Sequence, residues 1–224
     1  MFGGGTGASQ KRTVGNTDEH GPRIRLRTVR DGPCQSVFVR VSVLASPPMS
    51  VEQHRRAAPT LLGFALITVS DTRTPTDDVS GRTLAQMARE AGHRVEGPVL
   101  VPDEVAAIRG AVEEALAREG IDVIVLTGGT GFSPRDVTLE AVGPLLERPV
   151  EGFGELFRML SWQQVGSAAM LSRAAAGLVG SRAIFLLPGS PKAVSLAMEK
   201  LILPEAGHLL GQAGRGLMTD LIPG

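Results

Sequence analysis

The stretch IDVIVLTGGTG, residues 121–131, decides the fold class. Apart from Asp122, residues 121–126 form an apolar run of strand length, which is typical of a strand buried on both faces of a parallel sheet. Three glycines in four residues follow directly, and glycine lets the backbone turn sharply and approach other groups closely. The stretch therefore predicts a central parallel strand that opens into a loop suited to contact with a ligand.

The surrounding sequence alternates between strands and helices. Residues 63–69 and 183–187 are further apolar runs of strand length, and residues 95–101 are expected to form another strand. Asp103 is placed to cap the helix that follows residues 95–101. The helix faces expected in the core are formed by Leu84, Met87, Ala88 and Ala91, by Val105, Ile108, Val112 and Leu116, and by Val194, Ala197, Met198 and Leu201. This order predicts an α/β fold: a doubly wound, mostly parallel sheet with helices on both faces, in a single domain with an N-terminal extension.

The composition is globular, with 42% hydrophobic and 21% charged residues among 224. We expect a poorly ordered extension over residues 1–58, a ligand-binding domain over 59–214 and a tail over 215–224. Two stretches of the extension alternate as strands do, Ile24–Val29 and Val37–Leu44. Every motif lies beyond Met49, so a second hypothesis is that the native protein starts there and lacks residues 1–48.

The formal net charge is zero, which gives no overall electrostatic case for a nucleic acid or a membrane as partner. Residues 1–58 hold nine Lys and Arg against four Asp and Glu, whereas the rest of the chain holds fourteen against nineteen. A nucleic-acid arm is therefore conceivable, but the chain has few aromatic residues and no Tyr for base stacking. A single cysteine excludes an intrachain disulfide, and no apolar run approaches the ~20 residues of a membrane span. A cytoplasmic location is expected.

Ligands of parallel sheets bind beyond the carboxyl ends of the strands, here after Val69, Leu126 and Leu187. The loop after Leu126 exposes several backbone N–H groups, a concave arrangement that suits phosphate, and its hydroxyl groups add donors. The residues expected to bind substrate in this loop are Thr127, Gly128, Gly129, Thr130, Gly131 and Ser133. A glycine-rich turn without chemical consequence is the alternative. The chain has neither the P-loop pattern nor a dinucleotide fingerprint after its first strand.

Two carboxylates accompany these loops. Asp136 follows the glycines, and Asp71 comes directly after the strand that ends at Val69. A carboxylate beside a phosphate site repels the ligand unless a cation lies between them, and Mg²⁺ typically uses one or two carboxylates plus phosphate oxygens. We therefore predict that Asp71 and Asp136 are catalytic and bind the metal. Helix capping by Asp136 and a local turn at Asp71 are the alternatives.

The loop after Leu187 has the sequence Pro188-Gly189-Ser190-Pro191-Lys192. Ser190 followed by Pro191 is a favourable helix start, and helix N-termini bind anions through free N–H groups. We expect Gly189, Ser190, Pro191 and Lys192 to bind substrate, although a well-capped helix alone would explain the pattern.

Together these motifs resemble the MoaB/MogA family of molybdenum cofactor biosynthesis, from about Gly63 to Gly211. The residues that carry the resemblance are Leu66–Asp71, Thr127–Thr138, Glu151–Glu155 with Arg158, Met170–Ala174 and Leu187–Val194. The resemblance implies a domain that binds molybdopterin and ATP, assembles as a homotrimer or homohexamer, and transfers AMP from ATP to the terminal phosphate of molybdopterin with Mg²⁺. It leaves the individual roles of Glu155, Ser172 and Arg173 open.

The main rival is a carrier or scaffold that binds molybdopterin without catalysis. A second is an enzyme that shares this domain, such as the CinA-like and MoeA-like proteins, which normally carry further domains. Whether the pathway uses molybdenum or tungsten is also left open by the sequence.

Overall fold

The computed structural model describes residues 1, 24–25, 28–29, 38–39, 42–43 and 60–219. The chain divides into two units, Met1–Met49 and Ser50–Gly224. In the first unit, β1 (Ile24–Arg25) pairs antiparallel with β4 (Ser42–Val43), and β2 (Thr28–Val29) pairs antiparallel with β3 (Phe38–Val39). Apart from these short strands and Met1, residues 1–58 lie outside the described residues, so the predicted poor order of this extension stays a prediction.

The second unit is built on a six-stranded sheet with the order β6-β5-β7-β10-β9-β8. The strands are β5 (Gly63–Val69), β6 (Arg94–Val101), β7 (Val123–Thr127), β8 (Arg148–Pro149), β9 (Ala175–Val179) and β10 (Arg182–Leu187). β6, β5, β7 and β10 run parallel, whereas β9 is antiparallel to β10 and β8 is antiparallel to β9. The parallel strands thus bring their carboxyl ends to one edge.

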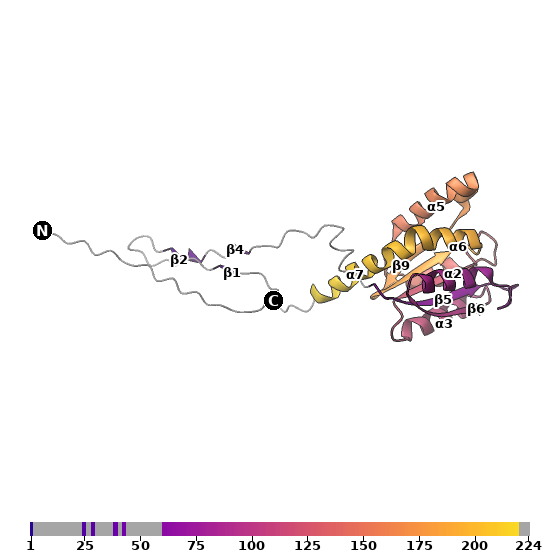
Figure 1. Ribbon diagram of the computed structural model, residues 1–224, viewed down its shortest axis with the longest axis horizontal. Helices are drawn as coiled ribbons and strands as arrows, with labels where there is room; N and C mark the ends of the chain where they lie inside the picture. Colours follow the sequence, from indigo (N-terminus) through magenta and orange to yellow (C-terminus); the bar gives the residue numbers. More distant parts are fainter. Residues whose placement is uncertain (2–23, 26–27, 30–37, 40–41, 44–59, 220–224) are drawn as a thin grey trace. The chain divides into compact units, whose positions relative to one another are not determined.

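Helices cover both faces of the sheet, α2 on one and α3 on the other (Figure 1). The α-helices are α2 (Val79–Glu90), α3 (Val105–Ala117), α4 (Thr138–Val142), α5 (Glu151–Val165), α6 (Pro191–Ala197) and α7 (Leu203–Thr219). The 3₁₀ segments are η1 (Gly143–Leu145) and η2 (Gly166–Leu171), and η3 (Met198–Ile202) is a π-helix between α6 and α7.

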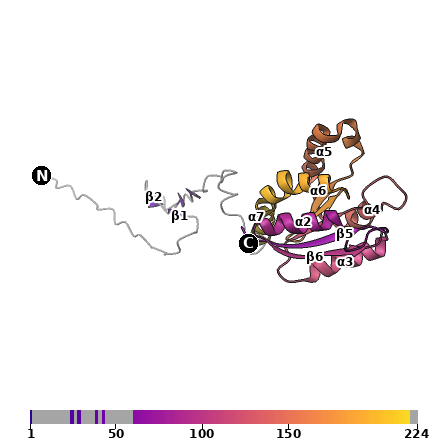
Figure 2. The same ribbon diagram turned by 45° about the vertical axis from the view of Figure 1, so that its right-hand side comes forward.

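The core has two layers because successive side chains of a strand point to opposite faces. Val123 and Val125 of β7 pack with residues of α2, α5, α6 and α7, whereas Ile124 and Leu126 pack with residues of α3 and α4. All four are completely buried, as expected for a central parallel strand. Turning the molecule shows the same layers, with α5 standing out from the sheet (Figure 2).

The predicted fold class is confirmed, with three differences in detail. The antiparallel β9–β10 hairpin was not predicted. Asp103 does not cap α3, because Glu104 occupies the N-cap position and makes no side-chain cap hydrogen bond. Helix α7 continues past residue 215, where the tail was expected to begin, and reaches Thr219 despite its glycines. No helix in the described part of the chain combines the length and apolar character needed to cross a membrane.

Candidate functional site

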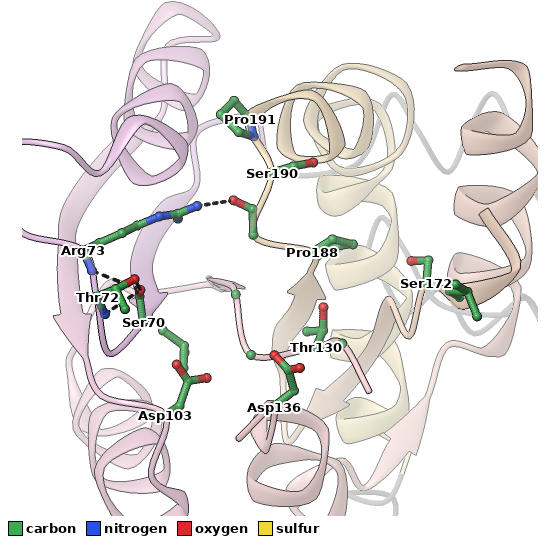
Figure 3. Close-up of a pocket in the computed structure, with 16 residues that line it drawn as sticks. Ser70, Thr72, Arg73, Asp103, Thr130, Asp136, Ser172, Pro188, Ser190 and Pro191 are labelled. Carbon is green, nitrogen blue, oxygen red and sulfur yellow. Dashed lines mark hydrogen bonds between the residues drawn. The ribbon is translucent and has the colours of Figure 1, made fainter. Parts of the chain in front are cut away.

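A cavity of about 670 Å³ opens at the carboxyl ends of the parallel strands, where the three predicted loops meet (Figure 3). Ser70, Thr72 and Arg73 of the first loop line one side. Gly128–Gly131 and Asp136 form the middle, and Pro188–Pro191 border it from the third loop. Val69, Asp103, Leu171 and Ser172 complete the lining. Segments more than 100 residues apart in the chain therefore share one site.

The glycine loop fits this place only because its first residues lack a Cβ. Gly128 has a φ of +105°, and a Cβ added there would lie 2.1 Å from the carbonyl oxygen of Val69. The N–H of Gly128 donates to the carbonyl of Leu187 at 3.0 Å. The loop is thus wedged between the ends of β5 and β10, in a backbone conformation that other residues rarely adopt.

Two predicted substrate-binding residues of this loop lie outside the cavity lining. Thr127 is completely buried, and its Oγ1 donates to the carbonyl of Pro188 at 3.0 Å, so it ties the second loop to the third. The backbone N–H of Ser133 donates to Oδ2 of Asp136 at 2.8 Å. Both residues stabilise the loop through these hydrogen bonds, and neither lines the cavity.

The third loop is held from the side of α2. The carbonyl of Gly189 accepts hydrogen bonds from Nη2 of Arg73 and from Oγ of Ser80, both at 2.7 Å. Ser190 caps α6 by accepting from the N–H of Ala193 at 3.2 Å. Lys192 is exposed on the first turn of α6 and is not a lining residue.

Arg73 is a cationic member of the site that sequence reasoning missed. Its Nη1 is buried and, among the residues that the structure describes, has no hydrogen-bond partner. The nearest carboxylate oxygen is Oδ1 of Asp78, 3.6 Å away. A guanidinium that lines a cavity is suited to a ligand phosphate or carboxylate, and Asp78 offsets part of its charge here. The signal in the sequence was its place in the first loop, two residues after Asp71.

Asp71 lies beside the cavity with both carboxylate oxygens engaged. Oδ1 accepts from the backbone N–H of Asp103 at 3.0 Å, and Oδ2 accepts from the guanidinium of Arg135. The hydrogen bond from Arg135, followed by that from Asp103, holds the pKa of Asp71 below its usual value. Asp71 is not a lining residue of the cavity.

Asp103 presents the carboxylate that Asp71 was expected to present. Its Oδ1 is buried without a hydrogen-bond partner in the described part of the chain. Burial raises the pKa of Asp103, and the charges of Asp71 and Asp136 raise it further. The side chains of Asp103 and Asp136 extend toward the same space, one from each side of the cavity (Figure 3). A carboxylate oxygen without a hydrogen-bond partner among the described residues thus lies next to the glycine loop.

This donor set is appropriate for a hard divalent cation. No group of three or more His, Cys, Asp or Glu side chains within the described ranges is arranged to hold a metal alone. Two facing carboxylates remain, and Mg²⁺ commonly takes one or two carboxylates and completes its shell with water and phosphate oxygens. Asp103 and Asp136 fit that requirement, because an orphaned carboxylate oxygen needs a positive partner.

Comparison with known proteins identifies the family. A family model described as a probable molybdopterin binding domain matches residues 65–208. Molybdenum cofactor biosynthesis protein B of Bacillus cereus is 48% identical over 162 residues, covering 72% of this chain and 96% of that protein. The chain belongs to the MoaB/MogA family. A crystal structure of a molybdenum cofactor biosynthesis protein B covers 70% of the chain with 47% identity and a TM-score of 0.68, spanning 99% of its own chain.

A second solved structure is also similar. The tungsten cofactor synthesizing protein MoaB from Pyrococcus furiosus is 36% identical, with a TM-score of 0.64, over 70% of this chain and 99% of its own. The residues matched by the family model lie within the second unit of the structure, and they include the loops that line the cavity. A role in molybdenum cofactor biosynthesis follows for this chain.

We expect Gly128→Ala to lower the free energy of unfolding by at least about 2 kcal/mol, because Ala is strained at this φ and its methyl group would collide with backbone. Gly110→Ala is the matched control. Gly110 lies within α3 with open space around its Cα, so Ala should raise stability by about 0.5–1 kcal/mol. Urea denaturation of both variants measures the difference, and equal effects would contradict the wedged geometry.

The orphaned carboxylate also predicts a pH dependence. Because the pKa of Asp103 is higher in the folded than in the unfolded chain, the folded state binds more protons between the two values, and its stability falls as the pH rises through that window. Asp103→Asn removes this penalty. The variant should unfold at a higher temperature than the parent at pH 7, and its advantage should vanish below the ordinary Asp value of about 3.9.

Thermal unfolding of both proteins between pH 3.5 and 8, without divalent cations, measures this advantage. Glu104→Gln, a change in the neighbouring exposed acid, is the control and should give a smaller difference. An advantage of Asp103→Asn that grows as the pH falls would contradict the assignment.

Proposed function

We propose that the chain catalyses Mg²⁺-dependent transfer of AMP from ATP to the terminal phosphate of molybdopterin. The observation that carries this proposal is the pair Asp103 and Asp136, two carboxylates that face a glycine loop suited to phosphate. Carboxylates so placed would repel a polyphosphate, and only a cation held between them makes the arrangement productive. A site for an uncharged ligand would not need them.

In the proposed reaction, an oxygen of the terminal phosphate of molybdopterin attacks the α-phosphorus of ATP. A new P–O bond forms, the bond between the α-phosphorus and the oxygen bridging to the β-phosphorus breaks, and pyrophosphate leaves with that oxygen. The nucleophile is already ionised, so the chain need not supply a general base. Its task is to bring two anions together and hold them in line.

The cavity residues divide this task. The backbone N–H groups of the glycine loop would neutralise phosphate oxygens, and the guanidinium of Arg73 would supply a positive charge at the cavity wall. Gly189 and Ser190 border the same space, where the hydrogen bonds from Arg73 and Ser80 fix the loop. These groups are held in place before a ligand arrives, which reduces reorganisation during the reaction.

Asp103 and Asp136 would hold Mg²⁺. When bound, the ion would supply a Lewis acid that offsets charge on the phosphate oxygens. For Asp71, which the sequence suggests as a metal ligand, we propose a positioning role, since Arg135 and the backbone of Asp103 already occupy its oxygens. By accepting from the N–H of Asp103, Asp71 positions that residue. We therefore transfer the metal-binding role from Asp71 to Asp103.

We also propose that the chain forms a homo-oligomer, a trimer or a hexamer. Helix α5 carries an exposed apolar stripe at intervals of three residues, formed by Leu156, Met159, Trp162 and Val165 with exposed fractions of 47%, 56%, 61% and 53%. Successive members of this row are neighbours on the helix surface, and contiguous exposed apolar side chains mark interaction surfaces on folded proteins. The stripe supports self-association, because every copy of the chain presents it.

Pyrophosphate release from ATP, Mg²⁺ and molybdopterin tests the activity. We expect Asp136→Asn and Asp103→Asn each to lower turnover by about a hundredfold, the scale of one lost electrostatic contact to a transition state. Molybdopterin binding should change much less, because the acids serve the reacting phosphates. Glu104→Gln, in the exposed acid next to Asp103, is the control and should retain the parent turnover.

A parent protein that binds molybdopterin but releases no pyrophosphate would refute the transferase and support the carrier. Normal turnover in both acid variants would refute the assigned metal site while leaving the transferase intact.

The apolar stripe predicts that Trp162→Glu lowers the molar mass measured by light scattering after size exclusion, because a charge at the centre of an apolar contact is costly. Val79→Glu is the control, since Val79 is 49% exposed at the start of α2 and Glu is tolerated at a helix N-terminus. A parent protein that is monomeric at micromolar concentration would contradict the proposal.

A further inference from the structure

Phe132 is an exposed aromatic ring in the middle of the glycine-rich loop. Its exposed fraction is 69%, whereas Phe64, Phe153, Phe157 and Phe185 are exposed by 6% or less. A phenylalanine left in water forgoes the free energy that burial would provide. In the unliganded protein, the exposed ring of Phe132 therefore contributes little of the hydrophobic free energy that burial would give.

The ring is nevertheless held in place. The guanidinium carbon of Arg173 lies 5.3 Å from the ring centroid, over one face of the ring. Arg173 is itself fixed, because it donates to the carbonyls of Thr130 at 3.1 Å and Asp136 at 2.9 Å and to the carboxylate of Glu140 at 2.6 Å. One face of Phe132 is thus backed by a rigid cation, and the large exposed area leaves the ring accessible from outside.

The position of the ring ties it to the cavity. Phe132 follows Gly131, and Arg173 follows Ser172; both Gly131 and Ser172 line the cavity. Leu171 lines it as well and is 58% exposed. The polar phosphate-binding floor therefore has apolar surface at its border, next to the loop that carries the ring.

We infer that Phe132 stacks against the planar heteroaromatic ring of a ligand whose phosphates lie on the glycine loop. This inference rests on the proposed function, because it requires a phosphorylated heterocycle in the cavity. Purine and pterin share the relevant chemistry, a flat π-face without net charge. Arg173 is a positioning residue in this arrangement, since it fixes the ring and the loop together.

The stacking contact has a characteristic size. Base–aromatic stacking is sequence-tolerant, and its loss weakens binding by about tenfold or more per ring. Because the contact involves only the heterocycle, the affinity for a bare polyphosphate should not depend on it. Comparing ligands that carry a heterocycle with a bare polyphosphate therefore tests the stacking contact.

Calorimetric titration in Mg²⁺ buffer measures the Kd of ATP, inorganic tripolyphosphate and molybdopterin for the full chain and for three variants. Phe132→Leu removes the aromatic face, and Phe132→Trp restores one. Leu61→Ala is the control, because it changes an exposed apolar residue just before β5 that lies outside the cavity lining and outside the apolar stripe of α5. We expect Phe132→Leu to weaken at least one of the two ring-bearing ligands about tenfold while tripolyphosphate changes less than twofold. Phe132→Trp should recover the parent affinity, and Leu61→Ala should match the parent throughout.

The ligand that loses affinity identifies the ring, purine if ATP weakens and pterin if molybdopterin weakens. Unchanged affinities of Phe132→Leu for both ring-bearing ligands would overturn the stacking role and leave the proposed function standing. An equal loss for tripolyphosphate would also overturn it, because the variant would then have disturbed the loop. A change in molar mass would do so too, since Phe132 would then contact a second copy of the chain. A parent chain that binds none of the three ligands would instead refute the proposed function itself.

Discussion

The structure depends on one close backbone contact, that of Gly128 with the strands on either side of it. Its Cα leaves no room for a side chain against Val69, and its N–H is bonded to Leu187. This contact forces the glycine loop into the space between β5 and β10 and exposes its other face. The first and third loops follow these two strands and therefore flank the glycine loop. The close contact at Gly128 thus helps to form the cavity from three distant segments.

Charge follows from that geometry. The loops bring Asp71, Asp103 and Asp136 close enough for the first and last to raise the pKa of the second. Arg135 compensates Asp71, and the guanidinium of Arg73, which is paired with Asp78 at 3.6 Å, lines the cavity. The site therefore combines a cationic side chain with the carboxylates of Asp103 and Asp136, which suits a metal-bound polyphosphate better than either an anion or a cation alone.

The sequence predicted the framework well because burial on both faces leaves a strong periodic signal, as in Ile121–Leu126. The sequence did not predict which side chains point toward the cavity. Asp71 and Asp103 both follow a parallel strand at the same edge, and only the course of each turn determines which carboxylate faces the cavity. Arg135 was not assigned a role, because its contact with Asp71 spans 64 residues. The β9–β10 hairpin was missed, since its short strand of small residues, Ala175–Val179, has little β-branched character.

The strand order has a consequence for how firmly each part of the site is supported. β5, β7 and β10 each have a hydrogen-bonded neighbour on both sides, whereas β6, among the strands that the structure describes, is paired with β5 alone. Interior strands open only when the whole domain unfolds, but border strands fray at much lower cost. Asp103 follows the border strand, and the glycine loop follows an interior one. The glycine loop is therefore attached to the more rigid part of the sheet, whereas Asp103 is attached to the edge strand, which opens more easily.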